Sequence, residues 1–219
     1  MLNGKYKAFL VVSFVLIALI MGICVFIICK VHIYAVSELS MSPELEPGDR
    51  VVAMDFSDGK RPDILGKVVV FYFPFGSFQN RIECVPEVKF IKRCVGIPGD
   101  TVNIRYNADR RKDADVPMTS SDVITNIGGY HGDDIFNMSP VYVPAAGDTV
   151  KTSEPSYALY KKIIEYEQRQ GNISGSPGMH VFDRNYYFVT GDNHTASYDS
   201  RHWGFVPEEF LISYMLFKF

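Results

Sequence analysis

A long uninterrupted apolar run lies near the start of the chain, from residue 8 to residue 29. Its 22 residues include no charged side chain and no proline. At about 1.5 Å of rise per residue, a helix over this run spans about 33 Å, enough to cross the hydrocarbon core of a bilayer. A soluble helix is rarely apolar on every face. The run therefore predicts a transmembrane helix; the alternative is a cleavable signal peptide, for which Ala35-Val36-Ser37 offers small residues two positions apart.

Positive charge flanks this run unevenly. Lys5, Lys7 and the amino terminus precede it, and only Lys30 follows it closely. Basic flanks favour the cytoplasmic side of a membrane. We therefore expect residues 1–31 to form a single-pass anchor with its N-terminus in the cytoplasm and the rest of the chain on the outer face.

Short runs of β-branched and aromatic residues, bounded by proline and glycine, dominate the rest of the chain. This pattern is typical of strands. The expected strands cover residues 50–54, 67–73, 90–95, 101–104, 186–190 and 210–217. We predict a mainly β fold, with an antiparallel β core formed by residues 32–105 and 181–219.

Residues 106–180 differ in composition, with more Asp, Gly and Ser, and are predicted to form an inserted α+β cap on the core. Their clearest element is a helix over residues 154–170. Ser153 can cap it, Pro155 suits its first turn, and Gly171 ends it. Its apolar side consists of Leu159, Tyr160, Ile163, Ile164 and Tyr166.

Composition and charge exclude several classes of protein. The 219 residues are 47% hydrophobic, which excludes general disorder. Of the 22 basic side chains three lie in the first 31 residues, which leaves 19 basic against 25 acidic side chains in the remainder. No basic field is therefore present to bind nucleic acid.

Metal and cofactor signatures are absent as well. The chain has no CxxC, no HExxH, no GxSxG and no phosphate-binding glycine loop, and its five histidines show no metal-ligand spacing. We expect neither a metal nor a cofactor. Cys24 and Cys29 lie within the apolar run, and a disulfide between Cys84 and Cys94 stays open as the less favoured alternative.

Three ordered motifs and an intervening strand carry a specific signal. They are SELSMSPELEPGD at residues 37–49, GKVVVF at 66–71, FIKRCVGIPGD at 90–100, and GDN at 191–193 followed by SYDSRHWGFVP at 197–207. Behind an N-terminal apolar run, this series resembles the conserved boxes of bacterial type I signal peptidases. The resemblance covers about half of the chain and omits the insertion.

The resemblance implies a serine–lysine pair, with Ser40 as nucleophile and Lys92 as general base. A serine hydroxyl needs a base to become nucleophilic. A lysine acts as a base only when neutral, and burial favours its neutral form. Phe90, Lys92 and Cys94 share one face of the expected strand, which can desolvate the amine. The alternative for Lys92 is an ordinary strand lysine whose amine reaches solvent.

Further residues are expected to support this pair. By the resemblance, Ser197 hydrogen-bonds the Lys92 amine. Asp199 and Arg201 are two residues apart and can share a face, so we expect them to form a charged pair that holds the Ser197 loop. The Ser40 N–H is expected to be the first donor to the oxyanion. Some family members place a serine two positions before the nucleophile as the second donor; here that residue is Glu38, so Ser37 or another backbone N–H takes this role.

The resemblance also implies the substrate and the location. The implied substrates are signal peptides of exported preproteins, with small residues at the first and third positions before the cut. The implied location is the outer face of a bacterial cytoplasmic membrane, where the protein contacts the lipid bilayer. Five apolar residues either line the pockets for these small side chains or belong to the core, and the sequence favours neither interpretation. They are Val36, Met41, Leu45, Phe90 and Ile91. The alternatives are a processing peptidase for pilus or conjugation components, and an inactive membrane-tethered binding protein.

Overall fold

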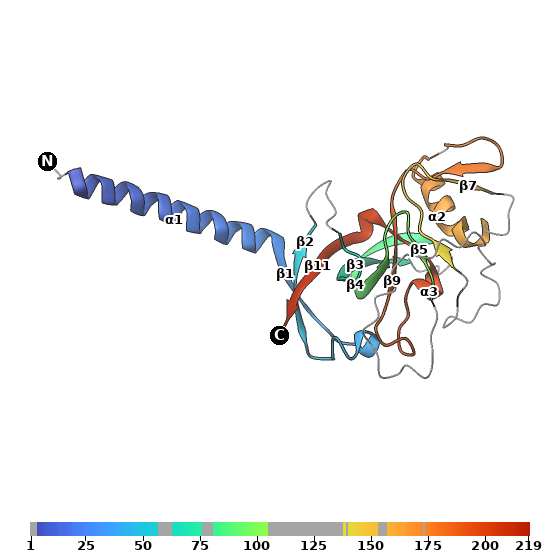
Figure 1. Cartoon of the computed structure of the whole chain (residues 1–219), viewed down its shortest axis with the longest axis horizontal. Helices are drawn as coiled ribbons and strands as arrows, with labels where there is room; N and C mark the ends of the chain where they lie inside the picture. The colour runs from blue at the N-terminus through green and yellow to red at the C-terminus, as the bar shows by residue number, and fades with distance from the viewer. Residues whose placement is uncertain are drawn as a thin grey trace.

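The structure, a computed structural model, describes residues 4–56, 63–75, 81–104, 138, 140–152, 157–172 and 174–219. Helix α1 (Gly4–Lys30) projects from the rest of the chain as one rod and leads directly into strand β1 (Val31–Ala35) (Figure 1). The 22 residues Phe9–Lys30 have a mean hydropathy of 3.2, and none of this span is buried. By length and composition this helix can cross a membrane, as the sequence predicts.

The strands form an antiparallel sheet whose spatial order differs from the sequence order. Seven strands lie in the order β1-β2-β11-β3-β4-β9-β10. Strand β11, from the far end of the sequence, is inserted between β2 and β3. The mainly antiparallel β fold predicted from the sequence is confirmed. The further strands of the sheet are β2 (Arg50–Asp55), β3 (Val68–Phe75), β4 (Ile82–Gly96), β9 (Tyr186–Thr190), β10 (Val206–Pro207) and β11 (Leu211–Lys218).

Alternate side chains of β3 enter two different hydrophobic clusters. Val69 and Phe71 belong to a large cluster on one face of the sheet, whereas Val68 and Val70 belong to a smaller cluster on the other. Met41, from the loop after β1, is part of the smaller cluster. Because β3 is buried on both faces, its sequence is apolar without interruption.

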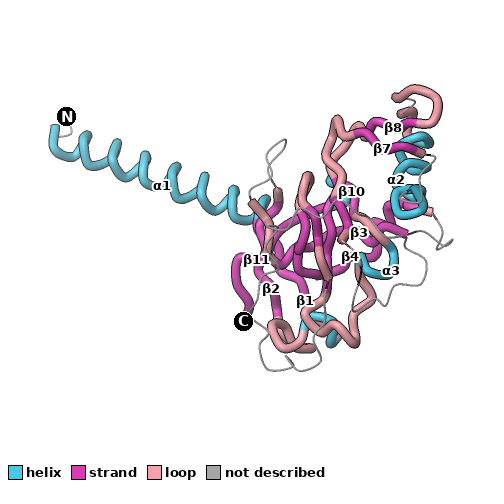
Figure 2. The backbone as a smooth tube through the Cα atoms, turned by 45° about the vertical axis from the view of Figure 1, so that its right-hand side comes forward, coloured by secondary structure: helices cyan, strands magenta, loops and turns pink. Residues whose placement is uncertain are grey.

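A further helix and two short pairs of strands lie outside the seven-stranded sheet. Helix α2 (Tyr157–Arg169) lies near the pair β7 (Thr149–Lys151) and β8 (Met179–Val181), away from α1 in both views (Figures 1 and 2). All five apolar residues predicted for its inner side are buried. A second short pair joins β5 (Thr101–Val102) to β6 (Val141–Tyr142).

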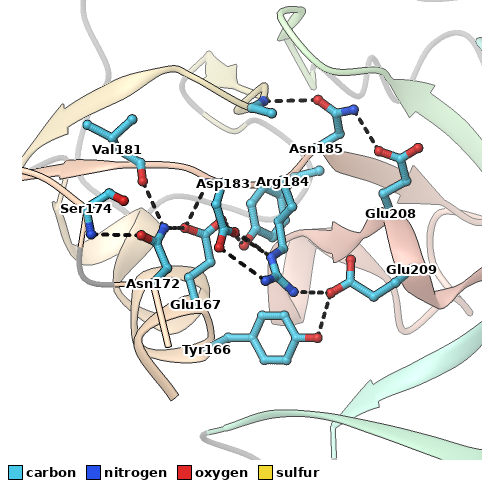
Figure 3. A network of polar contacts seen from close by, with 12 residues as sticks. Tyr166, Glu167, Asn172, Ser174, Val181, Asp183, Arg184, Asn185, Glu208 and Glu209 are labelled. Carbon is cyan, nitrogen blue, oxygen red and sulfur yellow. Dashed lines mark hydrogen bonds and ion pairs between the residues drawn. The ribbon is translucent and has the colours of Figure 1, made fainter. Parts of the chain in front are cut away.

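A buried carboxylate fastens α2 to the sheet. Glu167 has no exposed surface, and it accepts hydrogen bonds from Tyr186 Oη at 2.8 Å and Asn172 Nδ2 at 2.7 Å. His180 Nε2 lies 2.8 Å from the same carboxylate. Beside it, Arg184 and Tyr166 both donate to Glu209 of the turn η3 (Glu208–Phe210) (Figure 3). Helix α2 is therefore bound to the neighbouring strands by charged as well as apolar contacts.

Some predicted boundaries need correction. Strand β1 was not expected, and β4 begins at Ile82 rather than residue 90, so it passes through Pro86. Strand β3 likewise passes through Pro74; the β3–β4 register shifts on both sides of Phe73, and such irregularities tolerate proline. The strand expected over residues 101–104 ends at Val102.

Other expectations about the core have mixed outcomes. Cys84 is exposed and Cys94 is buried on the same strand, and both are free, so the disulfide alternative is wrong. Gly171 adopts φ +98° just after α2, as expected of a residue that ends a helix. Ser153 and Pro155 lie outside the described residues, as does most of the start of the insertion. The division into core and insertion therefore stays a prediction.

Candidate active site

Ser40 lies in a short 3₁₀ turn, η1 (Leu39–Met41), in the loop between β1 and β2. Its neighbour Met41 is 1% exposed in the smaller hydrophobic cluster, and Leu45 is fully buried there. Hydrogen bonds from Val36 N to Asp49 O and from Gly48 N to Val36 O, each 2.9 Å long, close the base of the loop. The buried anchors and the closed base fix the position of Ser40, which is itself buried.

Lys92 reaches Ser40 from the middle of β4. The two atoms Lys92 Nζ and Ser40 Oγ are 2.6 Å apart, within hydrogen-bonding distance. Lys92 is opposite Val69 in the β3–β4 register, and its side chain is 3% exposed. Its Nζ lies 5.2 Å from the centre of the Phe90 ring, which stacks on Phe73 at 4.6 Å. The amine is thus buried, with the Phe90 ring and the Ser40 hydroxyl beside it.

The enclosure changes the proton affinity of the amine. Burial lowers the pKa of Lys92 below its ordinary value, because the ammonium form loses its water shell. The charges of Asp199 and Glu38 oppose this shift, but the net direction is downward. At a given pH, a larger fraction of Lys92 therefore has the neutral amine that a general base requires than an exposed lysine has.

The turn after β9 contacts the backbone of Ser40. Asn193 N donates to the carbonyl oxygen of Ser40 at 3.1 Å. At Gly191 a Cβ would collide with that same carbonyl oxygen and with Ser197 Oγ. Only glycine allows this close approach, which explains the glycine of the GDN motif.

Asp199 organises the end of this loop. It accepts hydrogen bonds from Ser197 Oγ at 2.7 Å, from Gly191 N at 2.9 Å, and from Arg201 Nε and Nη2 at 2.8 Å each. Burial alone would raise the pKa of the Asp199 carboxyl, but hydrogen bonds from His202 and Arg201 outweigh burial and hold that pKa well below its ordinary value. The Asp199–Arg201 pair therefore has the geometry expected from the sequence.

The hydrogen bond expected between Ser197 and Lys92 is not formed in the described structure. Both residues are described, and the Ser197 hydroxyl donates to Asp199. A carboxylate is a stronger acceptor than a neutral amine, so the single hydroxyl proton goes to Asp199. Ser197 still lies beside Ser40, because both crowd the Cβ position of Gly191.

One ion pair of the site was missed by the sequence analysis. Arg93 donates to Asp192 through Nε at 2.7 Å and through Nη2 at 2.6 Å, and its Nη1 donates to Gly66 O at 2.7 Å. The pair joins the residue after Lys92 to the residue after Gly191. Both residues stand inside the quoted motifs, but no spacing rule links positions 99 residues apart.

The remaining predicted site residues divide between surface and core. Ser37 is exposed. Met41 and Leu45 are almost fully buried, which favours the core reading for both, and Val36 is 8% exposed. Phe90 and Ile91 are half-buried on opposite faces of β4. Within the described ranges, no three His, Cys, Asp or Glu side chains are grouped as metal ligands would be.

Known proteins resemble this chain over most of its length. The family model for signal peptidases, peptidase S26, matches residues 7–219. Signal peptidase I of Buchnera aphidicola subsp. Baizongia pistaciae is 26% identical over an alignment that covers 81% of this chain and 66% of the relative. Signal peptidase I of Pseudomonas aeruginosa is 27% identical, covering 78% and 56%. Signal peptidase I of Aquifex aeolicus is 26% identical, covering 80% and 70%. The chain thus spans less than two thirds of the length of the first two relatives.

Proposed function

The chain belongs to the signal peptidase family, peptidase S26, and on this premise we propose that it is a membrane-anchored serine endopeptidase that removes signal peptides from exported preproteins. The observation that carries the proposal is the 2.6 Å distance between Lys92 Nζ and Ser40 Oγ in a buried, aromatic-lined setting. Relatives that are named signal peptidase I support the substrate class.

Acylation begins with proton transfer from Ser40 to the neutral amine of Lys92. The Ser40 oxygen attacks the scissile carbonyl, and the carbonyl oxygen becomes an oxyanion that the Ser40 N–H stabilises. Ser37 or another backbone N–H is the second donor in this proposal. The Lys92 ammonium then gives its proton to the leaving amine, which completes the acyl-enzyme.

Deacylation repeats the same proton transfers with water in place of the hydroxyl. Neutral Lys92 removes a proton from the water that attacks the ester carbonyl, and it returns a proton to Ser40 as the ester bond breaks. Asp199, Arg201 and Ser197 support these steps as positioning residues, because they hold the turn that contacts the Ser40 carbonyl oxygen.

Substrate access is supported by an unpaired stretch of β4. Strand β9 pairs with β4 only at Arg93, Cys94 and Gly96. Among the described strands none pairs with the same edge of β4 before Arg93. An extended peptide can add to such an edge through main-chain hydrogen bonds. A peptide bound there would pass Phe90 and Lys92, the residues beside Ser40.

The location follows from α1 and the lysines around it. We place α1 across the cytoplasmic membrane of a bacterium, with the N-terminus in the cytoplasm and the β core on the outer face. The lysine in the base position favours bacterial or organellar enzymes over the reticulum homologues, which have histidine there. The bilayer therefore holds the catalytic site close to the membrane-bound signal peptide.

Purified full-length protein in detergent, incubated with a panel of preproteins and leader peptides, tests the proposal. Cleavage after a small-x-small sequence, located by N-terminal sequencing of the product, is the expected result. Ser40→Ala should abolish cleavage, and Ser176→Ala, at an exposed turn of the cap, should retain it. Failure of the unmodified protein to cut any preprotein overturns the proposal. Selective cleavage of pilus or conjugation precursors would favour the specialised processing peptidase instead.

A further inference from the structure

Glu38 carries an exposed carboxylate two residues before Ser40. It is the residue before η1, has extended backbone angles (φ −123°, ψ 159°), and its side chain makes no capping hydrogen bond. Glu38 is exposed, while Ser40, two residues later, is buried beside Lys92. Within the part of the chain that the structure describes, no residue binds this carboxylate, so it is available to another molecule.

The other acids that act on Lys92 are already paired. Asp199 is bound by Arg201, and Asp192 is bound by Arg93. Within the described ranges no hydrogen bond or ion pair holds Glu38. Its charge nevertheless reaches the amine, since it raises the pKa of Lys92 against the effect of burial. Among the described residues, Glu38 is thus a negative charge without a partner, two residues before Ser40.

Such a charge opposes the proposed reaction. The oxyanion that forms next to Ser40 is also negative, so the two like charges repel each other, and the repulsion is stronger where the site excludes water. A cation brought by the substrate would cancel this repulsion, and it would bind Glu38 directly. An acidic substrate side chain at the same place would add to the repulsion.

We propose that Glu38 is a specificity-determining residue, which selects substrates that carry lysine or arginine beside the scissile bond and disfavours those with aspartate or glutamate there. This inference rests on the proposed function, because it names the substrate class of the same site. It concerns the substrate positions near the cut other than the first and third before it, where small residues are already expected.

A charge series of peptide substrates tests this proposal with the full-length protein in a non-ionic detergent. The peptides share one cleavable sequence and carry Lys, Gln or Glu at the second position before the cut, or at the first or second position after it. We expect kcat/KM for Lys to exceed that for Glu by about three- to tenfold at one or more of these positions. The ratio should fall toward one in about 0.5 M salt, because screening shortens the range of the charge.

Two variants assign the effect to Glu38. Glu38→Gln should bring the Lys-to-Glu ratio close to one and raise the rate on the Gln peptide, and Glu38→Lys should invert the ratio. Glu44→Gln is the matched control: it removes an exposed acid from the same loop and should keep the ratio of the unmodified protein. Fluorescence of Trp203, the single tryptophan, verifies that each variant is folded.

The outcomes separate this inference from the proposed function. Cleavage of all peptides at equal rates overturns the inference alone. The same holds if Glu38→Gln keeps the charge ratio of the unmodified protein. No cleavage of any peptide or preprotein overturns the proposed function, and the inference with it.

Discussion

Arg93 forms a two-pronged ion pair with Asp192, with N–O distances of 2.7 and 2.6 Å. Arg93 follows Lys92 on β4, and Asp192 follows Gly191 in the turn that contacts the Ser40 carbonyl oxygen. The pair therefore sets the distance between the strand that carries the amine and the turn that supports the serine.

The first prediction concerns this pair. Arg93→Gln should lower kcat about tenfold or more with little change in KM, because small displacements of reacting groups are costly in rate. Arg93→Lys keeps the charge but loses the bidentate hydrogen bonds, so its kcat should lie between those of the unmodified protein and Arg93→Gln. Steady-state kinetics on one preprotein separates kcat from KM. If Arg93→Gln loses stability while both constants stay unchanged, the positioning role is wrong.

The second prediction concerns pH. Neutral Lys92 is the active form, so the cleavage rate should rise with pH and level off with a midpoint below the ordinary lysine pKa of about 10.4. Glu38→Gln should move that midpoint further down, because it removes a charge that raises the pKa of Lys92. Single-turnover rates across the alkaline range measure both midpoints. A flat profile would exclude a lysine base.

The third prediction concerns the stability cost of Lys92. Its folded-state pKa is lowered, so between that value and about 10.4 the unfolded chain binds more protons, and the free energy of unfolding rises with pH. Below this window the folded protein carries the full cost of a buried ammonium. Lys92→Met should therefore raise the free energy of unfolding at neutral pH, because it removes the buried ammonium.

Urea titrations of the Lys92→Met variant and the unmodified protein at several pH values provide the measurement. The difference in the free energy of unfolding between the two proteins should shrink as the pH approaches the pKa of a free lysine, about 10.4. Trp203 is 2% exposed and lies 5.7 Å from Phe90, so its fluorescence reports unfolding next to the site. A variant that is less stable at neutral pH would contradict the account of burial.

The fourth prediction concerns the cap. Glu167→Gln replaces one acceptor oxygen by a donor that faces donors from Asn172, Tyr186 and His180. It should lower the free energy of unfolding by about 2–3 kcal/mol. Glu165→Gln, two residues earlier and part of a surface pair with Lys161, should change it by no more than about 0.5 kcal/mol. Equal effects would mean that the buried network does not fasten α2.

Local patterns in the sequence predict much of this fold. The run over residues 186–190 is β-branched and aromatic throughout, and β9 has those same bounds. Residues 31–35 follow the membrane-length helix without a break, so no proline or glycine marks the start of this strand in the sequence. The position of β11 between β2 and β3 comes from long-range pairing, which local patterns do not encode.

Local patterns in the sequence predict less of the candidate site than of the fold. Ser40 and Lys92 are 52 residues apart, and only the motifs suggested that they meet. The competition for the Ser197 proton depends on where Asp199 lies, and the sequence shows only that Asp199 is two residues away. The Arg93–Asp192 pair likewise depends on the pairing of β4 with β9.

The most direct test of the serine–lysine pair is the single-turnover cleavage rate of one preprotein by Lys92→Met, measured beside the unmodified full-length protein in detergent. Methionine fills a similar volume without an amine, and the fluorescence of Trp203 verifies the fold. The account predicts a rate at least about a thousandfold lower, because among the described residues no other base lies within hydrogen-bonding distance of Ser40 Oγ. A rate close to that of the unmodified protein would contradict it.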